Sequence, residues 1–233
     1  MTEADKKKRM FYIEESQMWT CPRTGVWEVI CVGGGASGAV ALKMSNPFQP
    51  GIMLYGVGGS TSFGDYQSAN GAKYYNTCSP NVSDDISSRL SLRGYTCLNY
   101  AETHDLKSGS SVVYAITDIG YGTSGVAIEK PAVKLNFGEG SSDNIDLVAI
   151  PPFPPGDIKI NHIDLSENDV VPCTIGKGGD INDVTEEQVN NVMHAWSSSR
   201  NVVNWDTTKK ILAQKLSSGN DGGIILKYLG TEV

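Results

Sequence analysis

The glycine spacing between Gly33 and Gly38 is the feature of this sequence that points most clearly to a chemical function. Gly33-Gly34-Gly35-Ala36-Ser37-Gly38 contains the pattern G-x-G-x-x-G, and it directly follows the apolar run Val29–Val32. In a dinucleotide site, two such glycines let the backbone turn and approach a pyrophosphate, and the third lets a helix pack close to the strand. The anion would then lie at the N-terminus of that helix.

The residues that follow fit such a site only in part. A stretch of this kind resembles the entry of FAD-dependent flavoproteins, and Ile52–Tyr55 lies where their second strand would fall. That run ends in glycines, however, and no acidic residue that could hold the ribose hydroxyls occurs before Asp65. Pro47 stops any helix after Gly38 at about two turns. An FAD- or NAD-binding oxidoreductase that uses Gly33–Gly38 therefore remains the alternative function.

Other side chains with catalytic potential do not form a recognised pattern. None of the three histidines, His104, His162 and His194, belongs to H-x-x-x-H, and no C-x-x-C occurs among the five cysteines. Four acidic residues of the middle region could supply a glycosidase pair, but nothing in the sequence selects two of them. They are Glu102, Asp118, Glu129 and Glu139. We therefore expect no enzyme activity, no catalytic residue, no metal and no cofactor.

Composition and charge narrow the function further. The 233 residues include 26 glycines and 39% hydrophobic residues, which is enough apolar surface to exclude a wholly disordered chain. A net charge of −7 argues against binding to nucleic acid. No apolar run approaches the roughly 18 residues of a membrane span, and residues 2–9 are charged rather than signal-like. We expect assembly in a reducing cytoplasm, with the cysteines as buried free thiols.

The elements that must carry these residues are mainly strands. Short runs rich in valine, isoleucine and aromatic residues lie between turn residues along most of the chain. They are Met18–Cys21, Val26–Val32, Ile52–Tyr55, Val112–Thr117, Ala132–Phe137, Ile145–Ile150, Asp157–Ile163 and Gly222–Tyr228. In Asp157–Ile163 the alternation places Ile158, Ile160 and His162 on one half-buried face. The pattern predicts an antiparallel, jelly-roll-like β-sandwich with glycine-rich loops.

Two helices interrupt the strands near the C-terminus, within residues 184–216. Thr185-Glu186-Glu187-Gln188 is a capping-box pattern, and an apolar stripe follows it from Val189 to Trp196. Asp206 could cap a second helix over Thr207–Leu216. We expect this helical insertion to lie outside the sandwich core, and we expect the strands at 26–32 and 223–228 to share one sheet.

Four stretches resemble, in the same order, the glycine-rich domains of tailed-bacteriophage virion proteins. Trp19–Val29 leads into the glycine run as in that family, and Gly58-Gly59-Ser60-Thr61-Ser62-Phe63-Gly64, followed by Ala69-Asn70-Gly71, is similar to its G-G-S-T-S-F-G…A-N-G element. Leu165–Gly179 resembles its strand ending in I-G-x-G-G, and Asp221–Tyr228 resembles its closing strand. Residues 72–164 match no element of the family.

The resemblance implies a structural protein of a tail fibre, a tail tip or another peripheral part of a virion, active in assembly or host attachment. Its partners would be other virion proteins, copies of itself with a trimer favoured, and a glycan or protein of the host surface. The domain would span residues 16–233, after an attachment segment at 1–15 whose Phe11, Tyr12 and Ile13 could add to a partner's sheet. Loop residues are the expected binding residues. They are Gly58, Gly59, Phe63, Tyr74, Tyr75 and Tyr121.

Overall fold

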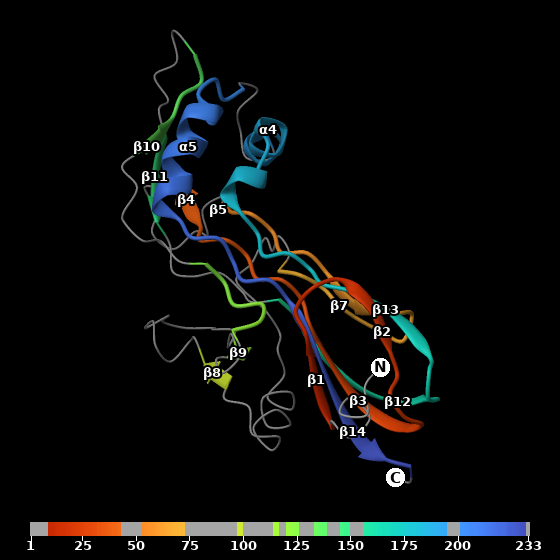
Figure 1. Ribbon diagram of the computed structural model, residues 1–233. Coiled ribbons are helices and arrows are strands. Elements are labelled where there is room, and N and C mark those ends of the chain that lie inside the picture. The colour runs from red at the N-terminus through yellow and green to blue at the C-terminus, as the bar shows by residue number, and fades with distance from the viewer. Residues whose placement is uncertain are drawn as a thin grey trace.

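Two antiparallel sheets form a β-sandwich from the two ends and the middle of the chain (Figure 1). The first sheet has the order β1 (Met10–Ile13), β14 (Gly223–Gly230), β3 (Gly25–Val32) and β12 (Ile158–Leu165). The second has the order β2 (Gln17–Thr20), β13 (Val170–Thr174), β6 (Thr61–Phe63) and β7 (Gln67–Ala69). The expected mainly β, antiparallel fold is confirmed, and β3 pairs with β14 through Ile30 opposite Ile225 as predicted.

The computed structural model describes the greater part of the chain. The described residues are 9–42, 53–72, 97–99, 114–116, 120–125, 133–138, 145–149, 156–194 and 201–231. Within residues 72–164, for which the sequence offers no family match, only short pieces are described before residue 156. One of these pieces is the two-stranded pair of β8 (Cys97–Asn99) and β9 (Tyr114–Ile116).

Aromatic side chains fill the space between the two sheets of the sandwich. The Trp19 and Trp27 rings meet edge to face with centroids 5.3 Å apart, and Phe63 lies 5.7 Å from Trp19. Phe11 of β1 closes the cluster at 5.9 Å from both tryptophans. Large rings in offset contact bury much apolar surface, so this cluster is a main source of stability for the sandwich.

The burial pattern of β12 differs from the expected simple alternation. Ile158 is buried and Ile160 is partly buried on one face, as predicted, but His162 is exposed, and Ile163 and Leu165 are buried on the opposite face. The first pair packs with Ile30 and Ile225, whereas the second belongs to the core between the sheets. The first sheet therefore has buried side chains on both faces, which a prediction based on one buried face per strand misses.

A second hydrophobic core lies at the other end of the molecule, where three helices pack on a third sheet (Figure 1). This sheet has the order β10 (Val133–Leu135), β11 (Ile145–Ala149), β4 (Val40–Leu42) and β5 (Met53–Leu54). The helices are η1 (Ile181–Asp183), α4 (Glu186–His194) and α5 (Trp205–Lys215). Trp205 is fully buried here and donates its indole N–H to the Val184 carbonyl oxygen at 2.9 Å.

The helix boundaries confirm one predicted cap and correct another. The Thr185 Oγ1 accepts from the Gln188 N–H, and the Gln188 Oε1 accepts from the Thr185 N–H, so the capping box is formed. Asp206 does not cap the second helix, because α5 begins at Trp205 and Asn204 is its N-cap. The Asn204 side chain instead donates to the Lys134 carbonyl oxygen of β10 and accepts from the Asn136 N–H just after that strand. Asp206 lies in the first turn of α5, where its charge interacts favourably with the helix dipole.

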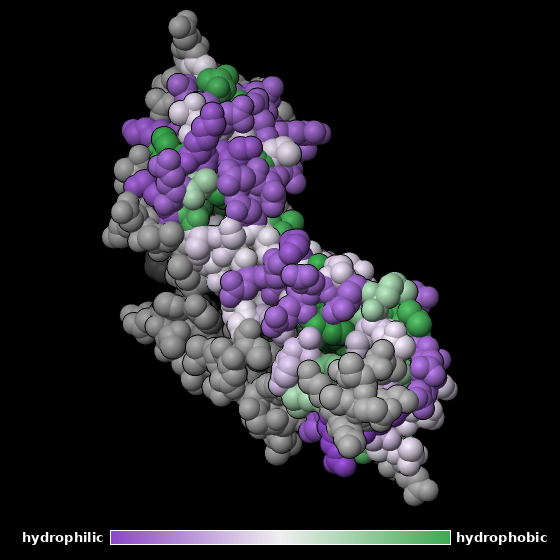
Figure 2. Space-filling view, viewed as in Figure 1, coloured by the Kyte–Doolittle hydropathy of each residue, from purple (hydrophilic) through white to green (hydrophobic). Residues whose placement is uncertain are grey.

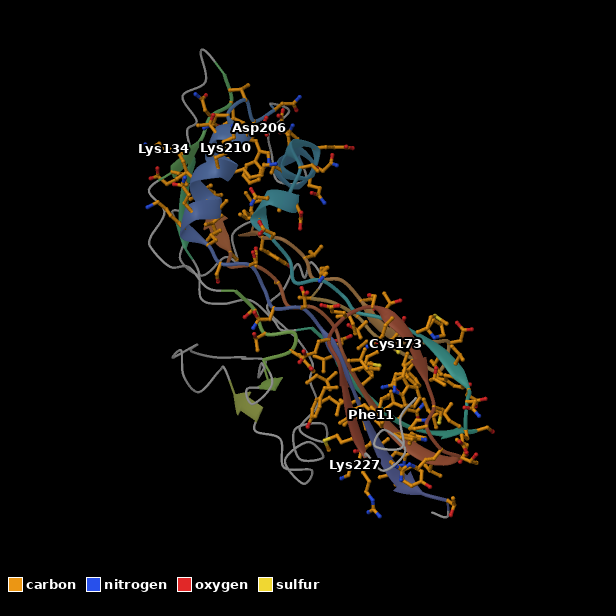
Figure 3. The ribbon with its side chains drawn as sticks, in the orientation of Figure 1. Phe11, Lys134, Cys173, Asp206, Lys210 and Lys227 are labelled. Atoms are coloured by element: carbon orange, nitrogen blue, oxygen red, sulfur yellow. The ribbon has the colours of Figure 1, made fainter. Side chains whose placement is uncertain are left out.

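Three cysteines of the described chain are free and buried, as the sequence predicts. They are Cys21, Cys31 and Cys173. Cys31 of β3 and Cys173 of β13 belong to the same core between the two sheets of the sandwich, where Figure 3 shows Cys173 surrounded by other side chains. Burial away from water raises the pKa of the Cys31 thiol to about 12 and that of the Cys173 thiol to about 11.

These two thiols are expected to make the protein less stable in alkali. Both release their protons more readily in the unfolded chain, where a thiol has a pKa of about 8.5, so the unfolded state gains stability as pH rises above that value. Together they should lower the free energy of unfolding by roughly 2 kcal/mol between about pH 9 and pH 10. Urea unfolding across this range measures the effect. A Cys31→Ala/Cys173→Ala variant should have a flatter dependence on pH, and an unchanged slope would contradict the assignment.

Candidate functional site

The Gly33–Gly38 segment has no regular secondary structure and, with Ala39, connects β3 to β4. No helix follows Gly38, because β4 begins at Val40. The next described strand, β5, pairs with β4 in the antiparallel direction. Within the residues that the structure describes, the strand–helix–parallel strand unit of a dinucleotide site is therefore absent at this segment.

The backbone donors of this segment are already engaged inside the protein. The N–H groups of Gly33, Gly34 and Gly35 donate to the carbonyl oxygens of Asp157, Gly59 and Asn220 at 2.9, 2.9 and 3.0 Å. Those of Ser37 and Gly38 donate to Gly56 and Ser217 at 3.0 and 2.8 Å. A pyrophosphate would need these same donors. The local geometry consequently does not favour a dinucleotide at this glycine pattern.

The hydrogen bonds of the segment define what we call the glycine bundle. Segment 33–38 lies at its centre, and six other segments each form a backbone hydrogen bond with it. The six segments are 56–59, 70–72, 122–125, 156–157, 176–179 and 217–222. Neighbouring outer segments also bond to each other, for example through the Gly59 N–H and the Lys177 carbonyl oxygen at 2.7 Å. The glycine bundle joins the sandwich to the helical end of the molecule (Figure 1).

Close approach of backbones explains why glycine is required in the bundle. A Cβ atom added at Gly34 would overlap the Lys177 carbonyl oxygen, and one added at Gly58 would overlap the Gly34 carbonyl oxygen. Such backbone atoms cannot move aside as the end of a flexible side chain can. The glycines thus allow separate segments to lie at hydrogen-bonding distance without side chains between them.

Two aspartates connect outer segments of the bundle through side-chain hydrogen bonds. The Asp221 carboxylate accepts from Lys177 Nζ at 2.6 Å and from the Gly178 N–H at 2.7 Å. Burial alone would raise the pKa of Asp221, but these hydrogen bonds outweigh it and lower the pKa. Asp180 accepts from Ser218 Oγ at 2.5 Å and from the Asn182 N–H at 2.7 Å, which lowers its pKa as well. Both carboxylates therefore tie segment 176–179 and its continuation to segment 217–222.

The predicted binding residues do not form one exposed surface among the residues that the structure describes. Gly58 and Gly59 are half-buried in the bundle, whereas Phe63 is fully buried between the sheets of the sandwich. Tyr121 is also buried and donates its hydroxyl to Glu14 Oε1 at 2.8 Å. Tyr74 and Tyr75 lie outside the described residues.

The candidate catalytic residues are likewise not assembled in the described part of the chain. His162 Nε2 lies 3.2 Å from Oε2 of the buried Glu28, its neighbour across the sheet. His104 lies outside the described residues, and for His194 only the backbone is described, within α4. The four acidic candidates of the middle region, Glu102, Asp118, Glu129 and Glu139, also lie outside the described residues. Among the residues described, no group of three or more metal-ligating side chains lies together.

Exposed apolar side chains on the second sheet are a surface feature that the sequence reading missed. Met18 of β2 and Val170 of β13 point outward and are among the most exposed large hydrophobic side chains described. Met18 is directly opposite Pro172, so apolar side chains of neighbouring strands meet on this face. Figure 2 shows hydrophobic side chains gathered over β2 and β13. The outward alternation of Met18 and Thr20 around the buried Trp19 is the signal that could have revealed it.

Comparisons with protein-family models, with curated proteins and with solved structures found no match for this chain. Among its described helices, none combines the length and the apolar composition that crossing a bilayer requires.

Proposed function

We propose that this chain is a non-enzymatic structural protein of a tailed-bacteriophage virion, located in a tail fibre, a tail tip or another peripheral part. The observation that carries the proposal is the meeting of all four family-like stretches in one structural unit. They contribute segments 33–38, 56–59 with 70–72, 176–179, and the end of segment 217–222 to the glycine bundle. A shared architectural role is a physical reason for these stretches to occur together.

The internal hydrogen bonds of the Gly33–Gly38 backbone also support a structural role rather than dinucleotide binding. Residues 33–38 lie at the centre of the bundle and are all buried. A substrate or cofactor could reach their backbone only by breaking hydrogen bonds that hold separate segments together. A protein whose glycines form internal backbone contacts is suited to holding its two ends in a fixed arrangement. Its proposed partners are other virion proteins, copies of itself and the host surface.

The virion assignment is tested by locating the protein in purified particles. We expect mass spectrometry of particles banded in a density gradient to detect the chain at a stoichiometry of several copies, and we expect antibody-labelled electron microscopy to place it on the tail. As a control, a non-structural phage protein should be depleted from the same bands. A chain that is abundant in infected cells but depleted from particles to the same degree would contradict the proposal.

The same preparation separates the structural function from the alternative one. The purified chain should show no visible absorbance, because amino-acid side chains do not absorb there and a bound flavin does. A yellow protein that releases flavin on denaturation would favour the oxidoreductase. Particles that contain the colourless chain would support the structural proposal.

A further inference from the structure

The strand β1 has a free edge in the described part of the chain. It is the outermost strand of its sheet, next to β14. The Arg9 carbonyl oxygen accepts from the Tyr228 N–H at 2.8 Å, so Arg9, Phe11 and Ile13 direct their backbone groups toward β14. In an antiparallel pair the residues between them direct theirs to the opposite side. The backbone groups of Met10 and Tyr12 therefore face away from the sheet.

This edge lacks the usual protection against pairing with another chain. Natural edge strands carry charges, prolines or bulges that discourage a further strand. Met10-Phe11-Tyr12-Ile13 contains no charged residue and no proline, and its pairing with β14 is regular over all four residues. The Tyr12 side chain is 46% exposed beside this edge. The strand is thus a template to which another extended strand can add.

Opposite charges flank β1 at its two ends. The basic run Lys6-Lys7-Lys8-Arg9 precedes the strand, and Glu14 and Glu15 follow it. When two copies of this strand pair in the antiparallel direction, the basic flank of each copy meets the acidic flank of the other. Parallel pairing would bring like charges together, which is unfavourable. The charge pattern therefore selects a second copy of the same strand in one orientation.

We propose that two copies of this chain associate through antiparallel pairing of their β1 strands. Phe11 would lie on the two-fold axis, and Met10 of each copy would exchange backbone hydrogen bonds with Tyr12 of the other. The two four-stranded sheets would then form one continuous sheet across a closed two-fold interface, the commonest symmetry of homo-oligomers. A two-fold pair replaces the trimer favoured by the family resemblance, and it does not depend on the location of the protein in a virion.

The test uses two full-length variants with reversed flanks. One has Lys7→Glu, Lys8→Glu and Arg9→Glu, so both its flanks are acidic, and the other has Glu14→Lys and Glu15→Lys, so both are basic. Each variant alone should dimerise at least about tenfold more weakly than the wild type, because like charges meet at both ends of the interface. An equimolar mixture should form a heterodimer. Sedimentation equilibrium distinguishes a 25.0 kDa monomer from a dimer of about twice that mass.

A proline placed on the free edge provides a matched control. Tyr12→Pro removes an N–H that faces away from β14, so it should abolish the dimer and leave the fold intact by circular dichroism. Phe11→Pro removes an N–H that faces β14 and should destabilise the sandwich itself. Three results would overturn the proposal. The wild-type chain could remain monomeric at millimolar concentration, it could form a trimer, or its oligomer could be unaffected by Tyr12→Pro and by both reversed flanks.

Discussion

Replacing Gly58 by alanine is expected to prevent the protein from folding stably. The new Cβ would overlap the Gly34 carbonyl oxygen at the centre of the glycine bundle, and neither backbone can move without breaking hydrogen bonds. Overpacking together with the loss of two such bonds should cost about 3 kcal/mol or more. That is a large part of the typical net stability of a domain. Chemical unfolding followed by circular dichroism measures the loss.

The adjacent glycine supplies the control for this prediction. For a Cβ at Gly59, the nearest atom would be the Lys177 backbone nitrogen at 3.0 Å, so a small shift accommodates it. We expect Gly59→Ala to cost about 1 kcal/mol or less, because a tight contact replaces an overlap. Equal losses for the two variants would show that the close packing of the bundle does not determine its stability.

Replacing Trp205 by alanine is expected to cause the largest loss in the helical end of the molecule. Its side chain is 1% exposed, belongs to the hydrophobic core of this end, and donates a hydrogen bond to the Val184 carbonyl oxygen. Removing a buried tryptophan of this kind typically costs about 3–5 kcal/mol. Thermal unfolding monitored by circular dichroism should show a correspondingly lower midpoint.

The conservative substitution separates packing from hydrogen bonding at this position. Trp205→Phe keeps an aromatic ring but leaves the Val184 carbonyl oxygen without its donor, and we expect a loss of about 1–3 kcal/mol. Val203→Ala is a surface control near the same helix, since Val203 is one of the exposed apolar residues, and it should change stability by less than about 0.5 kcal/mol. A Trp205→Ala variant as stable as the Val203→Ala variant would exclude Trp205 from the core.

The longest strands, β3, β12 and β14, were predictable because their local patterns are strong. Val26–Val32 is apolar apart from Glu28 and indicates a strand, and the structure extends it by one residue to Gly25. The capping box at Thr185 specifies a helix start from four residues alone. The predicted cap of the next helix, Asp206, was wrong because the N-cap is Asn204, two residues earlier. The Asn204 side chain bonds to the Lys134 carbonyl oxygen of β10, a contact that no local pattern reveals.

The glycine bundle could not be predicted from its parts. The G-x-G-x-x-G spacing of Gly33–Gly38 fits a phosphate loop and a bundle segment equally well, because both need a backbone without side chains. The distinction depends on partners such as Asn220, which lies far away in sequence. Phe63 shows the same difficulty for the candidate site, since its glycine-rich surroundings suggest a loop while its side chain belongs to the core.

The distribution of the bundle's partners along the chain has a consequence for biosynthesis. The Gly35 N–H donates to the carbonyl oxygen of Asn220, and the Gly38 N–H donates to that of Ser217. The centre of the bundle therefore stays incomplete until residues 217–220 have left the ribosome. Contacts of such long sequence separation make folding slow, because the entropy cost of closing a long loop precedes the formation of the stabilising hydrogen bonds. A nascent or prematurely terminated chain that ends before residue 217 would expose a glycine-rich backbone with unpaired donors, which makes it a natural substrate for chaperones and proteases.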